Sequence, residues 1–280
     1  MARPDPAQIS AQVALALAED VGTGDLTASL VPASVQAQAR VIAREKAVLC
    51  GTDWFDEVFR QVDPSVKIEW RLQDGDELND QVEVCLIQGS ARSVLSAERA
   101  ALNFLQTLSG TASRAALYVQ AIAGTGALIL DTRKTVPGLR LAQKYAVSCG
   151  GASNHRIGLY DAILIKENHI EAAGSIAAAL QAAQMLTETV EIEVEVENLD
   201  ELSQALAAGA RRVLLDNFEL SQLREAVAFN QGRARLEASG GVNLQTVRAI
   251  AETGVDDVSV GDITKDVKAV DFSMRFLELP

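Results

Sequence analysis

The sequence contains no apolar run long enough to cross a membrane, because polar residues and glycines interrupt the longest candidate. Its first ten residues, MARPDPAQIS, also lack the charged start, apolar middle and cleavage site of a signal peptide. The three cysteines, Cys50, Cys85 and Cys149, are odd in number, scattered, and form no CxxC pair. These absences predict a cytoplasmic protein with reduced thiols, and they argue against disulfides and structural zinc.

Positive charge is also scarce. The chain has 25 Lys and Arg against 38 Asp and Glu, a net charge of −13, and a pI near 4.7. Phosphate contacts demand a basic face, so we expect no nucleic-acid partner. No GxGxxG follows any apolar run, which weakens a dinucleotide-binding interpretation.

What is present indicates a globular protein with a large core, in one big domain or two, since 48% of the 280 residues are hydrophobic. A first helix is expected after Asp5, a capping residue, with Pro6 in its first turn. Short strand-like runs between about Ala37 and Val94 predict a small strand-rich domain. A helical stretch follows from about residue 97 to 123, with Ser96 as a plausible N-cap.

Beyond this helix, apolar runs alternate with alanine-rich helical segments, a pattern typical of β-α units. The six runs are ALILDTRK, AILIKENH, VEIEVEVEN, RVLLDNF, RLEASGG and DDVSVGD. Near-continuous apolar strands separated by helices predict a parallel sheet that is buried on both faces. With six units, a closed or nearly closed β/α barrel is favoured over an open sheet, and its chemistry should lie at the carboxyl ends of the strands.

Cations gather in one window of this acidic chain. Residues 131–169 hold six Lys and Arg, three Asp and Glu, and both histidines, His155 and His169. Arg133, Lys134 and Lys166 follow apolar strands, where a cation needs an anionic partner. The protein's own acids could supply some partners, but a substrate with several carboxylates or phosphates is the sharper interpretation. Arg140 and Lys144, four residues apart, fit a solvated helix face equally well.

Acidic and glycine-containing strand ends complete the pattern. In VEIEVEVEN the glutamates alternate with apolar residues, which suggests a row of carboxylates facing the barrel lumen or mouth. Glu195 and Asp216, at adjacent strand ends, could hold Mg²⁺ or sugar hydroxyls, although Asp216 alone could instead be a helix cap. The last two strands end in residues whose backbone N–H groups could bind a phosphate: Ser239, Gly240, Gly241 and Gly261.

These motifs resemble the quinolinate phosphoribosyltransferase family, and the similarity covers nearly the whole chain. It is carried by EDVGTGDLT, ERAALNFLQTLSG, DTRKTVPGLR, KYAVSCGGASNHRIGLYDAILIKENH, EVEVENLDEL, LLDNF, LEASGGV and DFSM. The resemblance implies an N-terminal α/β sandwich domain, residues 1–107, followed by an incomplete barrel of about seven parallel strands, residues 108–270. The C-terminal tail, about 271–280, is expected to pack back onto the first domain.

The resemblance also implies an activity. Phosphoribosyl would pass from phosphoribosyl pyrophosphate to quinolinate with decarboxylation, giving nicotinate mononucleotide, pyrophosphate and CO₂ in de novo NAD biosynthesis, with Mg²⁺ as cofactor. Lys134, Lys166, Glu195 and Asp216 would be catalytic. Quinolinate and neighbouring phosphate would contact Thr132, Arg133, Lys134, His155, Arg156 and Lys166. Glu195 and Asp216 would hold ribose hydroxyls and the metal, and Ser239, Gly240, Gly241 and Gly261 the 5′-phosphate.

The family also implies a homodimer or larger assembly in which Arg99 reaches the partner's site. Asp262 departs from the small apolar residue usual after Gly261, and a carboxylate pointing inward there would repel phosphate. Three other functions stay open: a phosphoribosyltransferase for another heterocyclic acid, a Schiff-base aldolase using Lys166, and a non-catalytic sensor of phosphorylated metabolites.

Overall fold

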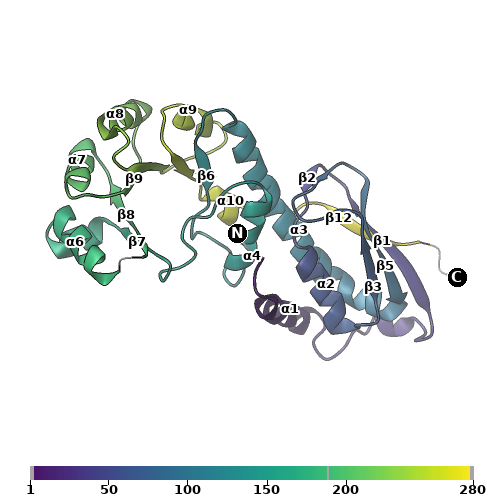
Figure 1. The fold of residues 1–280 in the computed structure, drawn as a ribbon. Coiled ribbons are helices and arrows are strands. Elements are labelled where there is room, and N and C mark those ends of the chain that lie inside the picture. The colour runs from purple at the N-terminus through teal and green to yellow at the C-terminus, as the bar shows by residue number, and fades with distance from the viewer. Residues whose placement is uncertain (1–2, 188, 278–280) are drawn as a thin grey trace. The chain divides into compact units, whose positions relative to one another are not determined.

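The computed structural model describes residues 3–187 and 189–277, which divide into two compact units (Figure 1). Of the described residues, the first unit comprises 3–116, 136–151 and 266–277, and the second comprises 117–135, 152–187 and 189–265. The predicted domain boundary at residues 107 and 108 falls inside one long helix, α3 (Ala91–Ala121), which continues from the first unit into the second.

Within the described part of the first unit, four strands form an antiparallel sheet in the order β12-β1-β5-β3. The elements of this unit besides α3 are α1 (Pro6–Asp20), η1 (Ala28–Leu30), β1 (Gln36–Ala43), β2 (Ala47–Val48), α2 (Thr52–Val62), β3 (Lys67–Trp70), β4 (Glu77–Leu78), β5 (Val82–Ser90), α4 (Arg140–Cys149) and β12 (Phe272–Phe276). Alternate residues of β1 are buried, so one face of the sheet packs on the core.

The helices of the first unit follow from local sequence. Asp5 caps α1 as predicted, since its Oδ1 accepts from the Ala7 N–H at 2.8 Å and Pro6 occupies the first turn. The predicted cap at Ser96 is wrong, because α3 already begins at Ala91 and the Ser96 hydroxyl donates to Asp25 Oδ2 at 2.8 Å.

The C-terminal tail returns to this unit by passing close to α3. A Cβ at Gly110 would lie 2.2 Å from the Lys268 carbonyl oxygen, so only glycine permits the approach. The Val270 N–H then donates to the Gln106 carbonyl at 3.1 Å, and β12 pairs antiparallel with β1. The last strand of the chain therefore completes the first sheet.

Among the described residues of the second unit, six parallel strands form a sheet in the order β6-β11-β10-β9-β8-β7. Its elements are β6 (Leu128–Leu130), β7 (Ala162–Ile165), α5 (Glu167–Ala173), α6 (Ile176–Leu186), β8 (Glu191–Val196), α7 (Leu199–Ala207), β9 (Arg212–Asp216), α8 (Leu220–Asn230), β10 (Arg235–Ser239), α9 (Val247–Ala251), β11 (Asp257–Ser259) and α10 (Asp262–Lys265). All six predicted strands are confirmed, and Figure 1 shows α6, α7 and α8 outside β7, β8 and β9.

The predicted seventh strand is reduced to a single contact. Ser153 forms an isolated parallel bridge with Leu130, on the edge of β6 that faces away from β11. The sheet therefore curves as a partial β/α barrel, and the fold class predicted from the sequence is confirmed. Among the described residues no helix combines the length and apolar character of a membrane span.

Candidate active site

A pocket of about 430 Å³ opens at the carboxyl ends of the parallel strands, within the second unit. It is lined by Thr132, Arg133, Lys134, His155, Arg156, Leu164, Lys166, Glu195, Leu214, Asp216, Glu237, Ser239 and Ser259. The structure thus brings together nine of the residues singled out in the sequence, from six separate segments. Of the six cations in the window 131–169, four line this pocket.

The segment after β6 is held against the end of β11. Lys134 donates its N–H to Thr132 Oγ1 at 3.2 Å, and its carbonyl accepts from the Thr264 hydroxyl at 2.8 Å. A Cβ at Gly261 would lie 3.2 Å from Lys134 Cδ, so the glycine leaves room for the lysine side chain. Gly261 therefore supports the position of Lys134 rather than lining the pocket itself.

A buried aspartate, Asp131, brings His155 and Arg156 close to Arg133 and Lys134. Asp131 is 0% exposed; its Oδ1 accepts from the His155 N–H at 2.9 Å and its Oδ2 from Asn154 Nδ2 at 2.7 Å. These bonds tie the chain at residues 154–156 to the end of β6. Arg156 and Arg133 therefore meet in one pocket.

The electrostatics of this pair favour an anion. Burial lowers the pKa of the Arg156 guanidinium, and the charge of Arg133 lowers it further. Arg156 Nη1 donates to the Ala162 carbonyl at 3.4 Å, but its buried Nε has no hydrogen-bond partner among residues 3–187 and 189–277. Adjacent cations with an unused buried donor are suited to binding carboxylate or phosphate.

The opposite side of the pocket is acidic. Lys166 Nζ bonds Glu195 Oε2 at 2.5 Å. Burial raises the pKa of Glu195 despite this lysine, and the neighbouring charge of Asp216 raises it further, so the two carboxylates lie close together. Asp216 Oδ2 accepts from Asn217 Nδ2 at 2.8 Å, and α8 is capped by Glu219 instead. The helix-cap interpretation of Asp216 is therefore wrong.

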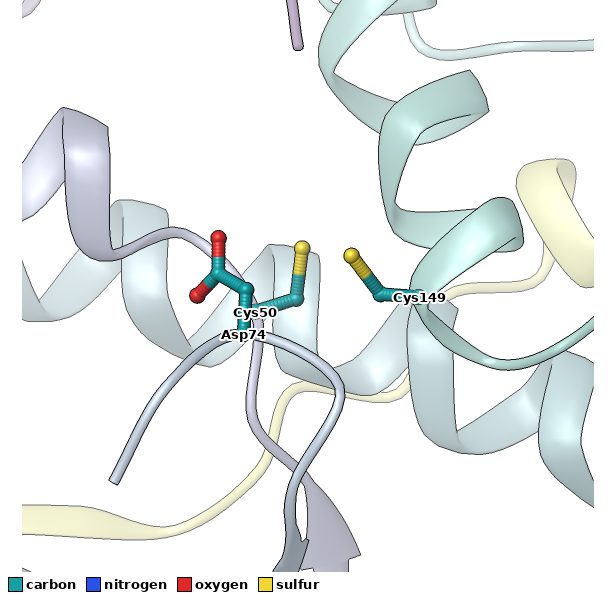
Figure 2. A group of neighbouring side chains, drawn as sticks. All are labelled: Cys50, Asp74 and Cys149. Atoms are coloured by element: carbon teal, nitrogen blue, oxygen red, sulfur yellow. The ribbon is translucent and has the colours of Figure 1, made fainter. Parts of the chain in front are cut away.

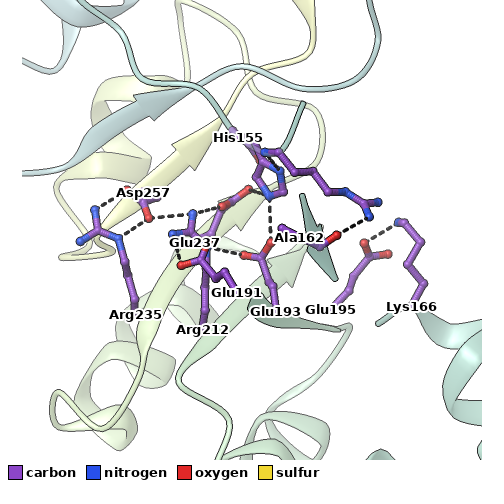
Figure 3. Close-up of polar contacts among 12 residues, drawn as sticks. His155, Ala162, Lys166, Glu191, Glu193, Glu195, Arg212, Arg235, Glu237 and Asp257 are labelled. Atoms are coloured by element: carbon purple, nitrogen blue, oxygen red, sulfur yellow. Dashed lines mark hydrogen bonds and ion pairs between the residues drawn. The ribbon is translucent and has the colours of Figure 1, made fainter. Parts of the chain in front are cut away.

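A set of ionic contacts, which we call the buried charge network, adjoins the pocket, since its members His155 and Glu237 also line the pocket (Figure 3). It consists of Glu193, Arg212, Glu237 and Asp257, with His155 and Arg235 at its edges. Arg212 Nε donates to Glu193 at 3.0 Å, and its Nη2 lies 2.6 Å from Glu237 Oε2 and 3.0 Å from Asp257 Oδ2. Arg235 grips Asp257 through two bonds of 2.5 and 2.6 Å.

The network explains the alternating glutamates of β8. Glu193 is 3% exposed and lies in the barrel interior, Glu195 reaches the pocket, and Glu191 and Glu197 are exposed at the two ends. In this row of carboxylates, Glu193 therefore takes part in the buried network, whereas Glu195, two residues later, lines the pocket. Burial raises the pKa of Glu237 to about 7, and the Glu193 charge adds to the effect.

His155 connects the network to the pocket. Its Nε2 lies 2.8 Å from Glu193 Oε2, and its Nδ1 accepts from the Arg156 N–H at 2.7 Å. Burial lowers the pKa of the imidazole, but the hydrogen bond to Glu193 and the nearby carboxylates outweigh it, and the pKa is raised. Both ring nitrogens are engaged within the protein, so the ring positions Arg156.

The family comparisons agree over most of the chain. Residues 25–109 match "Quinolinate phosphoribosyl transferase, N-terminal domain", and residues 111–275 match "Quinolinate phosphoribosyl transferase, C-terminal domain". The chain belongs to the quinolinate phosphoribosyltransferase family. It is similar to quinolinate phosphoribosyltransferase [decarboxylating] 1 of Nicotiana glauca, with 40% identity over 94% of this chain and 81% of the relative.

Bacterial family members are similar as well. The probable nicotinate-nucleotide pyrophosphorylase [carboxylating] of Bacillus subtilis (strain 168) is 40% identical over 91% of this chain and 89% of its own. The solved structure of the nicotinate-nucleotide pyrophosphorylase from Francisella tularensis matches with a TM-score of 0.97, 46% identity, and 98% of each chain covered.

Several predicted residues of this family member lie outside the pocket lining. Gly240 and Gly241 follow the lining residue Ser239, and Gly240 has φ +97°, where a Cβ would lie 2.1 Å from Asn217 Oδ1. Asp262 accepts from the Tyr118 hydroxyl at 2.6 Å, so its carboxylate has a partner on α3.

Other charged residues belong elsewhere. Arg99 is an exposed residue of α3 in the first unit. Lys144 is 0% exposed, so the solvated-face interpretation is wrong for it. His169 accepts from the Lys166 N–H at 3.0 Å and so supports the start of α5.

Sequence reasoning missed Asp131, Arg212, Glu237 and Asp257 as residues that organise this pocket. Asp131 stands in the quoted segment DTRK, and the other three are charged residues within apolar strands. A charge inside a buried strand is a signal that a partner is near, but the sequence does not show which strands are neighbours.

Proposed function

We propose that this protein transfers phosphoribosyl from phosphoribosyl pyrophosphate to quinolinate with decarboxylation, giving nicotinate mononucleotide, pyrophosphate and CO₂ for de novo NAD biosynthesis. The observation that carries this proposal is the division of one pocket into a cationic side, with Arg133, Lys134 and Arg156, and a side with Glu195 and Asp216. The names of the relatives describe the same activity in those proteins.

The cationic side suits the dianionic quinolinate. Arg133 and Arg156 can each present a planar fork to a carboxylate, while Lys134 and Lys166 act as point charges. His155 contributes by fixing the main chain at Arg156, since its Nδ1 accepts that residue's N–H. Thr132 fixes Lys134 in the same way from the other segment.

The acidic side suits phosphoribosyl pyrophosphate. Glu195 and Asp216 offer hard oxygen ligands on adjacent strands, in a pocket that also receives substrate, and this donor set fits Mg²⁺ held by one or two carboxylates and substrate phosphate. Such an ion would supply charge neutralisation of the departing pyrophosphate. Ser239, Gly240 and Gly241, with nearby Gly261, would hold the 5′-phosphate through backbone N–H groups.

The reaction needs positioning and electrostatics more than a covalent catalyst. As the C1′–O bond to pyrophosphate breaks, positive charge builds on the ribose, and Glu195 and Asp216 lie where they can stabilise it. The pyridine nitrogen, oriented by the cations on quinolinate's carboxylates, attacks C1′. The resulting cationic ring accepts the electron pair released as the 2-carboxylate leaves as CO₂. Lys134 and Lys166 stabilise charge on the reacting groups.

The assay that tests this function is release of ¹⁴CO₂ from quinolinate carrying label in its 2-carboxylate, with and without phosphoribosyl pyrophosphate. Release that depends on both substrates, with stoichiometric nicotinate mononucleotide, is expected. Turnover of another heterocyclic acid but not quinolinate would favour a related phosphoribosyltransferase. Borohydride trapping of a substrate on Lys166 would favour the aldolase, and binding without turnover the sensor.

We further propose a cytoplasmic homodimer or larger assembly in which Arg99 completes the partner's site. Arg99→Ala and Lys166→Ala should each be nearly inactive alone. A mixed dimer has one site with both defects and one with neither, so co-refolding should restore up to about one intact site per mixed dimer. Inactive mixed dimers, detected by native mass spectrometry, would show that Arg99 does not act across the interface.

A further inference from the structure

Two of the three cysteines meet in the first unit, although they are far apart in the sequence. Cys50 lies between β2 and α2, and Cys149 is the last residue of α4. Figure 2 shows their sulfur atoms facing one another, with Asp74 beside them. The two sulfur atoms and one Asp74 oxygen all lie within 4.8 Å of one another. Neither the odd number of cysteines nor their scattered positions in the sequence indicates this contact, so the prediction against a thiol pair did not anticipate it.

The scaffold holds both cysteines in place. Cys50 is buried, and its N–H donates to Ser109 Oγ at 2.9 Å while its carbonyl accepts from the same hydroxyl at 3.1 Å. Asp74 Oδ1 accepts from the N–H groups of Gly51 and Thr52, each at 3.1 Å, next to Cys50. The thiol of Cys50 is therefore fixed from two sides.

Cys149 is tied to the same point. Asp74 Oδ2 accepts from the Tyr145 hydroxyl at 3.0 Å, and Tyr145 lies one turn before Cys149 on α4. Asp74 thus links the loop that carries Cys50 to the helix that carries Cys149, which keeps the sulfur atoms together.

The two thiols differ in reactivity. The hydrogen bond from Cys50 lowers the pKa of Cys149, and Tyr145 lowers it further. Burial raises the pKa of Cys50 well above its usual value. Cys149 is also partly exposed, whereas Cys50 is buried. A partly exposed cysteine with a lowered pKa, next to a buried cysteine with a raised pKa, is the arrangement of an attacking and a resolving cysteine.

We propose that Cys50 and Cys149 form a reversible disulfide when the protein meets a hydroperoxide. The Cys149 thiolate attacks a peroxide oxygen, the O–O bond breaks, and Cys149 becomes a sulfenic acid as hydroxide leaves. The Cys50 sulfur then attacks the Cys149 sulfur, the S–O bond breaks, and water leaves with the Cys50 proton. Both sulfurs are oxidised, and one peroxide is reduced to two waters in all. A dithiol reverses the bond by exchange.

A zinc site is less well supported by the same residues. Both Asp74 oxygens already accept hydrogen bonds, three in total. The Arg3 charge also lies near enough to lower the pKa of Cys149, and a cation there opposes a metal ion. The cluster offers three ligands among the described residues, whereas structural zinc takes four.

The test starts from reduced protein exposed to hydrogen peroxide and then denatured for thiol titration. We expect a fall from three thiols to one, full recovery with dithiothreitol, and a peptide cross-link between Cys50 and Cys149 by mass spectrometry. Because the bond closes a loop of about 100 residues, the oxidised protein should unfold several degrees higher without reductant than with it.

Matched variants separate the roles. Cys149→Ser should keep both remaining thiols at a peroxide dose that oxidises the wild type. Cys50→Ser should trap Cys149 as a sulfenic acid that reacts with dimedone. Cys85→Ser is the control, because Cys85 is buried outside the pair, and it should form the bond as the wild type does.

Three results would overturn the proposal. One is wild-type protein that keeps three thiols in peroxide, and a second is a cross-link between two chains instead of within one. The third is zinc bound to the purified protein, detected by elemental analysis. Its release when a mercurial reagent titrates Cys50 and Cys149 would show that these thiols hold the metal. Each outcome is read on wild-type protein, so it does not depend on the folding of a variant.

Discussion

The buried charge network and the pocket that adjoins it are built from the same residue types, but they satisfy their charges differently. In the network, Arg212 contacts Glu193, Glu237 and Asp257, and Arg235 holds Asp257 from the other side. In the pocket, Lys166 pairs with Glu195, whereas Arg156 keeps a buried Nε without a partner among the described residues. The buried charges of the network pair with one another and so stabilise the barrel. At the strand ends, a cationic side chain with an unpaired donor is available to bind a ligand.

Strand register shows how closely the network and the pocket adjoin. Glu237 is level with Leu214 on one side and Asp257 on the other, and Glu195 is also level with Leu214. Asp216 and Ser239 form the next level toward the carboxyl ends. Inward-facing side chains of a barrel stack in such layers, and along β8 a step of two residues leads from the buried Glu193 to Glu195 in the pocket. The network continues into the layer of Glu195, because Glu237 and Asp257 lie at that level.

The largest effect is expected inside the network. Arg212→Ala leaves three buried carboxylates without their shared partner, and loss of one member of a buried ion pair costs about 3–5 kcal/mol. Urea denaturation should show that loss in the free energy of unfolding. Arg211→Ala, the exposed neighbour, is the matched control and should change little. Equal stability of the two variants would end the distinction between network and pocket.

The next effect concerns activity without stability. Arg133→Ala and Lys134→Ala should each lower kcat/KM for quinolinate at least about a hundredfold, or about 2.7 kcal/mol, because each removes a charge-assisted contact to a dianion. Thermal unfolding should stay near that of the wild type. Arg224→Ala, which removes an exposed cation on α8, controls for net charge. Unchanged kinetics in both pocket variants would remove the argument from the cationic side.

A smaller effect should separate the two sides of the pocket. Glu195→Ala and Asp216→Ala should weaken phosphoribosyl pyrophosphate binding about tenfold or more and quinolinate binding less, because the carboxylates are proposed to hold ribose and metal. Calorimetric titration of each ligand in Mg²⁺ measures both. Glu197→Ala is the control, because Glu197 is an exposed glutamate two residues after Glu195. Loss of quinolinate affinity alone would mean that the two sides are assigned in reverse.

Much of the barrel and its pocket could be predicted from the sequence, because the strands and the residues at their carboxyl ends are adjacent along the chain. The six apolar runs give the strands, and the residue after each run gives a side chain at the mouth, so Lys134, Lys166, Glu195 and Asp216 were found together. Contacts that join distant segments could not be read in this way. Asp131 holding Asn154 and His155, and Cys50 facing Cys149, depend on which segments become neighbours.

Local propensity also failed where packing decided the outcome. A serine at position 96 is a good helix cap by itself, but α3 starts five residues earlier and the hydroxyl bonds Asp25 instead. Lys144 fits an exposed helix face by spacing, but its helix packs so that the side chain is fully buried.

The smallest effect tests Glu237, whose Oε1 has an ion-pair contact of 3.6 Å with His155 Nε2 but no hydrogen bond among the described residues. Glu237 Oε1 is buried without a hydrogen-bond partner in the described chain, and burial raises the pKa of this group to about 7 from 4.5. The folded protein therefore holds this proton at higher pH than the unfolded chain does. The stability contribution is fully present below the unfolded pKa and is lost as pH rises through the folded pKa.

Glu237→Gln keeps the neutral form at every pH, so it should unfold at nearly the wild-type temperature at pH 5 and a few degrees higher at about pH 8. Thermal scans across this range measure the difference. The raised pKa of His155 adds a decline of the same sign. Because the Glu237 charge is one cause of that shift and Glu237 Oε1 lies 3.6 Å from His155 Nε2, Glu237→Gln reduces both declines, and the comparison reports this pair of groups. Glu225→Gln, at an exposed site on α8, should follow the wild type at each pH. If Glu237→Gln is instead less stable at pH 8, the ionised carboxylate supports the barrel through Arg212, and the network is fully paired.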